Sequence, residues 1–288
     1  MTTTSARSGE TYDSILHLTD FSPGSELAFA HALKIALQES ARLTIFHLDQ
    51  RGVSTLPWHE FPGVRATLQR WGLLEPDAPR EAAYDTLGIE VEKVVAHGKG
   101  VVQSVLHYLE QHPVDLLVLA THGRDGLPLW LSPSIAEPVA RYAQVPTLFV
   151  PHGARGCVAL DDGSVGLDQV LIPIDYQPPP QLGLEAALRL ARTLGNRHAD
   201  LTLLHVGEVG DMPAVTMPPE DELHCQRLLR VGSPVEEILK AADVLTADLI
   251  VMATAGHRGF LDALRGSTTE QVLRHAPCPV LAVSTASE

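Results

Sequence analysis

The chain has 288 residues, of which 45% are hydrophobic, and this is enough to fill the cores of about two domains of ordinary size. Its formal net charge is −14, with 21 Lys and Arg against 35 Asp and Glu. Because an acidic chain offers little to a phosphate backbone, we expect no nucleic-acid partner. No apolar run approaches the roughly 18 residues that cross a bilayer, so we expect no membrane insertion.

Three cysteines, Cys157, Cys225 and Cys278, are scattered along the chain and odd in number. Their spacing matches neither a zinc motif nor a disulfide framework, which indicates a reducing compartment. Residues 1–10 are small and polar and lack the apolar segment of a signal peptide. We therefore expect a cytoplasmic protein.

The first half alternates short apolar runs with helical patterns, which is typical of a parallel sheet with right-handed crossovers. Strands are expected at residues 13–19, 41–48, 89–97, 115–120 and 146–150, and helices at 23–38, 66–87, 100–112 and 134–144. An insertion at 51–80 contains Trp58, His59, Phe61 and Trp71. We interpret it as a loop that covers the sheet, with a partner-binding loop as the alternative.

The second half repeats this alternation in a shorter form. Strands are expected at residues 169–174, 199–206, 225–231, 248–253 and 279–284, and helices at 181–195, 233–244 and 267–276. Between His205 and Cys225 there is little room for a crossover helix, so that helix is expected to be short or absent.

Four segments of the two halves correspond closely, which indicates an internal repeat. The pairs are Ser14–Asp20 with Val170–Asp175, Ala41–His47 with Ala199–His205, Asp115–Thr121 with Asp248–Thr254, and Val145–Val150 with Cys278–Val283. The repeat predicts two copies of one α/β domain, residues 1–155 and 166–288, with a Gly- and Asp-rich linker at 151–168. Sheets of this kind bind ligands beyond the carboxyl ends of their strands, where Asp20 and Asp175 lie.

A loop punctuated by glycines, residues 253–267, follows the strand at 248–253. Ser267 and Glu270 have the spacing of a capping box, so Ser267 is expected to begin a helix. His257 and Arg258 add donors to the loop, and the first turn of a helix offers unpaired N–H groups to an anion. A phosphate group is the expected ligand of this loop. A tight strand-to-helix connection without a ligand is the alternative.

The spacing Ala253-x2-Gly256-x9-Gly266-Ser267 resembles the nucleotide signature of the universal stress protein family, Gly-x2-Gly-x9-Gly-(Ser/Thr), with alanine at the first glycine. The closing segment Arg274–Val283 is also similar to that family. The resemblance implies two tandem flavodoxin-like or Rossmann-like domains of the HUP (adenine-nucleotide α-hydrolase-like) class. Each would be a five-stranded parallel sheet with helices on both faces. It also implies that the two halves form an intramolecular pseudo-dimer, with their final strands paired.

The same resemblance implies roles for single residues in the second half. Asp175 would accept from the adenine amino group, Pro173 would shape the same wall, and Val206 would meet the base through its backbone. Met252 and Ala253 would line the ribose. Gly256, Gly266, Ser267 and Thr268 would cradle the phosphates, beside the donors that His257 and Arg258 add to the loop. ATP is the expected ligand, with Mg²⁺ as a possible companion, and AMP or a cyclic nucleotide stays open.

The first half departs from the signature. Pro133 stands in the place of Gly266, Asp125 in that of Arg258, and Trp130 in that of Ala263. Proline has no N–H and cannot adopt a positive φ, both of which a phosphate cradle uses. We expect weak or no triphosphate binding here, although Asp20 would leave part of an adenine pocket.

No Walker lysine or nucleophile elbow is present, so we expect a binding protein and at most weak ATPase activity. The 14 histidines form no metal-type pair on one element, and we interpret His47 and His205 as buried neutral side chains. The expected function is a nucleotide-dependent stress-response module that signals to an unidentified protein partner and could form homodimers. A ligand-free scaffold, a slow hydrolase or nucleotidyl-transfer enzyme and a metal-responsive regulator are the alternatives.

Overall fold

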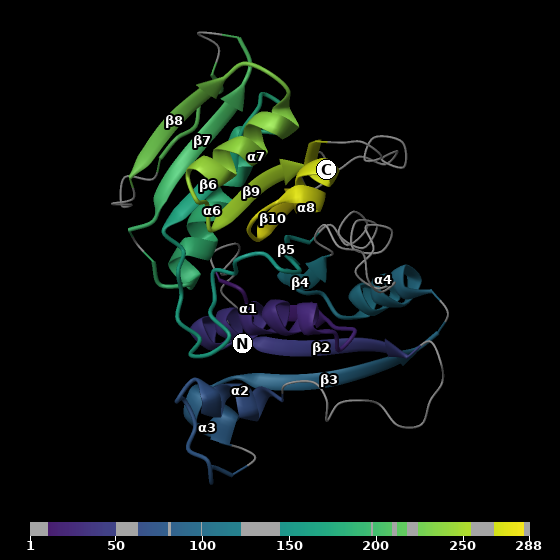
Figure 1. The fold of residues 1–288 in the computed structure, drawn as a ribbon. Coiled ribbons are helices and arrows are strands. Elements are labelled where there is room, and N and C mark those ends of the chain that lie inside the picture. The colour runs from purple at the N-terminus through teal and green to yellow at the C-terminus, as the bar shows by residue number, and fades with distance from the viewer. Residues whose placement is uncertain are drawn as a thin grey trace, which may run out of the picture.

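The structure, a computed structural model, describes residues 11–49, 63–79, 82–98, 100–121, 145–196, 198–208, 212–217, 224–254 and 268–284. Ten strands of these residues form one sheet in the order β3-β2-β1-β4-β5-β10-β9-β6-β7-β8 (Figure 1). The first five strands belong to the first half of the chain and the last five to the second half.

The elements of the first half are β1 (Ser14–Leu18), α1 (Pro23–Glu39), β2 (Arg42–Asp49), α2 (Val64–Arg70), α3 (Ala82–Leu87), β3 (Glu90–His97), α4 (Val101–Gln111), β4 (Leu116–Thr121) and β5 (Thr147–Pro151). All five strands were predicted to within one or two residues. The single helix predicted at 66–87 is wrong, because α2 ends at Arg70 and α3 begins only at Ala82. Gly72 adopts a φ of +70° directly after α2, and two prolines follow it, so the helix cannot continue. The helix predicted at 134–144 lies outside the described residues.

The elements of the second half are β6 (Gln169–Pro173), α6 (Pro180–Thr193), β7 (Asp200–Val206), β8 (Cys225–Arg230), α7 (Pro234–Val244), β9 (Leu249–Thr254), α8 (Thr268–His275) and β10 (Val280–Ser284). They agree closely with the predicted ranges. Where residues between β7 and β8 are described, at 212–217, the chain is not helical. The side-chain amide of Gln181 holds this segment by accepting from Thr216 N–H at 2.9 Å and donating to Thr216 O at 3.2 Å.

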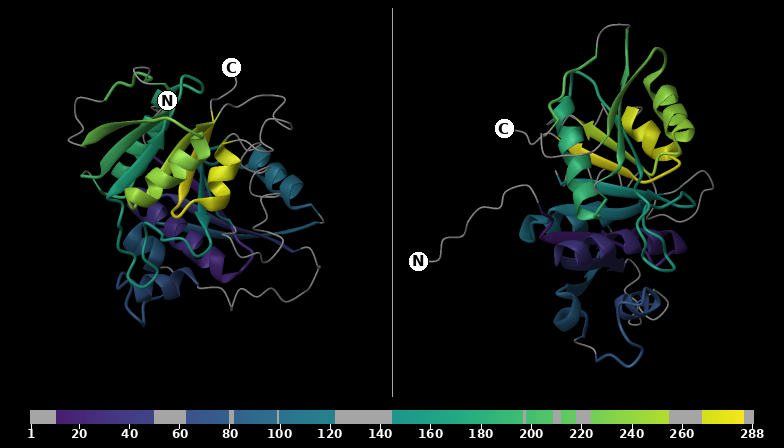
Figure 2. Two further views of the ribbon diagram at one scale, coloured as in Figure 1. Left: turned by 45° about the horizontal axis from the view of Figure 1, so that its top comes forward. Right: turned by 90° about the vertical axis from the view of Figure 1, so that its left-hand side faces the viewer.

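Within each half the strands are parallel, and helices cover both faces of the sheet, as predicted. Helices α1 and α6 pack with one core cluster, and α4, α7 and α8 pack with the other on the opposite face (Figure 2). The two halves meet where β5 and β10 pair antiparallel, with Phe149 opposite Val280 and Leu148 opposite Leu281. The predicted pairing of the final strands is therefore present within one chain, and it leaves neither of these strands as an open edge.

The expected linker is packed into the core over part of its length. Cys157, Val158 and Leu167 are buried, and Val158 forms a β-bridge with Val165. Trp71, from the end of the insertion, is only 8% exposed and donates from Nε1 to the carbonyl of Leu160 at 3.0 Å. Trp71 therefore closes one side of the linker, whereas Trp58, His59 and Phe61 lie outside the described residues.

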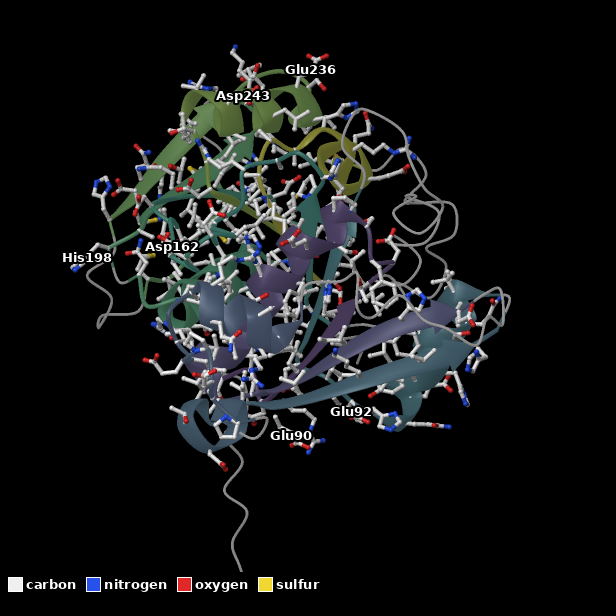
Figure 3. The ribbon with its side chains drawn as sticks, turned by 60° about the horizontal axis from the view of Figure 1, so that its bottom comes forward. Glu90, Glu92, Asp162, His198, Glu236 and Asp243 are labelled. Atoms are coloured by element: carbon white, nitrogen blue, oxygen red, sulfur yellow. The ribbon has the colours of Figure 1, made fainter. Side chains whose placement is uncertain are left out.

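Several carboxylates lie on the surface, at the start of a helix or in the linker. Glu236 lies in the first turn of α7, where the helix dipole favours a negative charge, and it projects outward as Asp243 does (Figure 3). In the linker, Asp162 accepts from Ser164 N–H at 2.9 Å, and its hydrogen bonds to Ser164 lower the pKa of this carboxyl.

A buried histidine fixes the linker to α1. His31 is fully buried, and its Nδ1 lies 2.7 Å from the carbonyl of Leu27, so Nδ1 carries the hydrogen. Its Nε2 is then free to accept from Cys157 N–H, at 3.1 Å. Burial lowers the pKa of His31 from 6.5 to about 4. The same cause lowers the pKa of the buried His17 to about 4.

These histidines predict how stability depends on pH. Between about pH 6.5 and 4 the unfolded chain binds protons that the folded chain does not, so the free energy of unfolding falls as the pH is lowered. Each histidine contributes a slope approaching ~1.4 kcal/mol per pH unit. In urea unfolding at pH 7, 6 and 5, His31→Gln should show a shallower loss of stability than wild type. An equal loss in both proteins would contradict the assignment of His31.

Candidate functional site

A pocket with a volume of about 270 Å³ lies at the carboxyl ends of β6, β7 and β9. This is the point in the second half where the strand order reverses around β6, the usual ligand position in such sheets. Its lining includes Pro173, Asp175, Val206, Met252, Ala253 and Thr268, which are the predicted site residues that the structure describes. The other predicted residues, Gly256, His257, Arg258, Gly266 and Ser267, lie outside the described residues, as do Asp125, Trp130 and Pro133 of the first half.

Pro173 ends the backbone hydrogen bonding between β6 and β9 at this point. The N–H of Ile174 donates to Leu204 O of β7 at 2.8 Å, and since successive residues of a strand face opposite neighbours, residue 173 faces β9. Proline has no N–H to donate there. The register between β6 and β9 accordingly covers Val170 and Leu171, whereas that between β1 and β4 continues to Leu18, the residue equivalent to Pro173.

Asp175 lies on the open side of this pocket. Its side chain is 67% exposed, and Oδ1 accepts from the N–H of Tyr176 at 2.8 Å. The carboxylate is therefore accessible to a donor on a ligand. Ile174, Leu204 and Ile238 add apolar side chains to the wall beside it.

The equivalent aspartate of the first half is used differently. Asp20 Oδ1 accepts from Ser22 N–H and from the Ser25 hydroxyl, each at 2.9 Å, and Oδ2 is buried. Phe21, which has a φ of +61°, lays its ring on that of His47 with 4.2 Å between centroids. Asp20 therefore braces the start of α1, and the partial adenine pocket expected around it stays a prediction.

Sequence reasoning missed one wall of the pocket. Gln177, Pro178 and Pro180 line it after Asp175, and Pro234 and Ile238 of α7 line it opposite. The signal was present as three consecutive prolines after a strand end, because proline suits the first turn of a helix and α6 begins at Pro180. Gln177 and Pro180 of the second half occupy the positions of Ser22 and Ser25 of the first half. Proline offers neither a hydroxyl nor an N–H to Asp175.

Metal ligation has no support in the described part of the chain, where no three His, Cys, Asp or Glu side chains are grouped to hold an ion. Pairs do occur, such as His224 Nδ1 with Asp200 Oδ1 at 3.2 Å. The described helices also include none with both the length and the apolar character needed to span a membrane.

Comparison with known proteins identifies the family. The model of the universal stress protein family matches residues 11–151 and 220–284. A universal stress protein of Mycobacterium tuberculosis is 24% identical over 295 residues, covering 91% of this chain and 94% of that protein. One of Methanocaldococcus jannaschii is 48% identical over 52 residues, which cover 18% of this chain and 31% of its own length.

A solved structure agrees with the fold. A universal stress protein from Archaeoglobus fulgidus superposes with a TM-score of 0.63 at 20% identity, covering 95% of this chain and 99% of that one. The chain belongs to the universal stress protein family, and two regions of it carry the family pattern.

The role of Pro173 can be tested by giving β6 the residue of the first half. In Pro173→Leu, an N–H becomes available toward β9, so the two strands should pair further and the pocket should shrink below about 270 Å³. A crystal structure of the variant measures both changes. An unchanged pocket would show that Pro173 does not keep the strands apart.

Proposed function

We propose that this protein binds an adenine nucleotide, ATP foremost, in the second-half pocket and acts as a nucleotide-dependent regulatory module for a protein partner. The observation that carries the proposal is the gathering of Pro173, Asp175, Val206, Met252, Ala253 and Thr268 around one pocket at the switch point. The segment with the signature spacing, Ala253 to Ser267, connects β9 to α8 in the sequence, and Ala253 and Thr268 both line this pocket.

The chemistry of the pocket supports such a ligand. Apolar side chains of Leu204, Ile238 and Met252 suit a flat base, and the accessible carboxylate of Asp175 suits its amino group. Thr268 and Thr269 begin α8 on the same pocket, so the first turn of that helix, where N–H groups can bind an anion, lies on the side to which phosphates would extend. Mg²⁺ could accompany the phosphates.

The proposal assigns one nucleotide to each chain. In the first half Asp20 is engaged by Ser22 and Ser25, so its carboxylate is turned to α1 and not outward. The Pro133 argument from the sequence points the same way. The first half then contributes support for the fold, and its β5 packs against α8.

The two aspartates give a matched test by calorimetric titration of nucleotide-free protein with Mg-ATP. Asp175→Ala should weaken binding by roughly 10- to 100-fold, the effect of losing a hydrogen bond to a charged group. Asp20→Ala should lower the stability of the fold, because α1 loses its brace, but should leave the dissociation constant within about twofold.

A third variant and the number of binding sites separate the alternatives. Gly266→Pro, which copies Pro133, should abolish binding because it removes an N–H from the loop. Two-site binding by wild type, or equal loss in both aspartate variants, would contradict a single second-half site. No binding by wild type would favour a ligand-free scaffold.

A further inference from the structure

We infer that His205 is a positioning residue of the second-half pocket. Its side chain holds the carbonyl of Ile174 and so fixes the direction in which Asp175 leaves β6. This inference rests on the proposed nucleotide site, and it assigns a function to a histidine that the sequence presented only as a buried side chain.

The geometry around Ile174 carries the first step. The register between β6 and β7 ends with Pro173 opposite Leu204, and one further backbone bond joins Ile174 N–H to Leu204 O at 2.8 Å. The carbonyl of Ile174 then lies 3.0 Å from His205 Nδ1. A carbonyl can only accept, so Nδ1 carries the hydrogen and donates it. Both backbone groups of Ile174 are thus fixed on β7, directly before Asp175.

Neighbouring groups hold the imidazole of His205 in one position. His205 is 6% exposed, and its Nδ1 lies 3.9 Å from Asp175 Oδ1. The ring of Tyr176 packs edge to face against the imidazole, with 5.9 Å between the ring centroids. A methyl group at Gly207 would lie 2.4 Å from His205 Nε2, so the ring occupies space that only glycine leaves open.

The first half contains the same bond without the accessible carboxylate. His47 Nδ1 lies 2.9 Å from Thr19 O, and Thr19 N–H donates to Phe46 O at 3.0 Å. The next residue, Asp20, is held by the start of α1. The two histidines therefore fix the same point of the backbone in both halves. In the second half this point, Ile174, directly precedes Asp175, which lines the pocket.

The test compares matched variants of the full chain by calorimetric titration with Mg-ATP and by urea unfolding. His205→Phe keeps a flat ring and removes the donor, so the dissociation constant should rise by roughly five- to tenfold. His205→Asn places an amide nitrogen near the position of Nδ1 and should bind within about twofold of wild type. His47→Phe should lower stability as His205→Phe does, and should leave the dissociation constant unchanged.

Gly207→Ala supplies a second variant that does not remove the histidine. The backbone of Gly207 is not in the left-handed region, so alanine adds no backbone strain there. Its methyl group, however, would displace the imidazole of His205. This variant should also weaken ATP binding.

The outcomes separate this inference from the proposed function. If wild type binds ATP and both His205→Phe and Gly207→Ala bind equally well, the inference is wrong and the nucleotide site stands. An equal loss of affinity in His47→Phe would also overturn it, because the effect would then be general. If wild type does not bind ATP, the proposed function fails and the inference fails with it.

Discussion

The antiparallel pairing of β5 with β10 holds the two halves of the molecule together. It joins two parallel five-stranded sheets into one, and the core beneath α1 and α6 is continuous across the junction. Helix α8 begins at the pocket with Thr268 and packs against β5 of the other half, where Val272 and Phe149 share a core cluster. A first half that binds no nucleotide therefore still supports the helix whose first turn faces the pocket.

The two halves show how a repeated scaffold diverges at its sites while the fold is kept. The pairing of β1 with β4 continues to Leu18, whereas Pro173 at the same position has no N–H to donate to β9. Ser25 gives Asp20 a hydroxyl to accept from, and Pro180 at the matching place gives Asp175 none. A few substitutions at the strand ends are enough to leave one aspartate bonded to the start of a helix and the other accessible, without any change in strand order.

Much of the fold followed from local patterns in the sequence. The strands are short apolar runs with polar boundaries. Because the two halves repeat, the elements of the first half predicted most elements of the second. The helix predicted at 66–87 was wrong because the chain is interrupted at Gly72, whose positive φ ends α2. The predicted residues of the site that are described do share one pocket, because the ends of parallel strands meet at one edge.

Other features of the site depend on contacts that a sequence pattern does not contain. The orientation of Asp20 is set by hydrogen bonds to Ser22 and Ser25, and the sequence alone suggested that both aspartates would be alike. The function inferred for His205 rests on its distance from the Ile174 carbonyl across two strands, which only the folded chain shows.

The central claim is that one nucleotide lies in the second half, and a crystal structure of the protein with Mg-ATP tests it most directly. We predict one nucleotide per chain, with its base between Asp175 and Met252 and its phosphates at the start of α8. A nucleotide at the carboxyl ends of β1 and β4, beside Asp20, or a pocket that stays empty at saturating ATP, would contradict it.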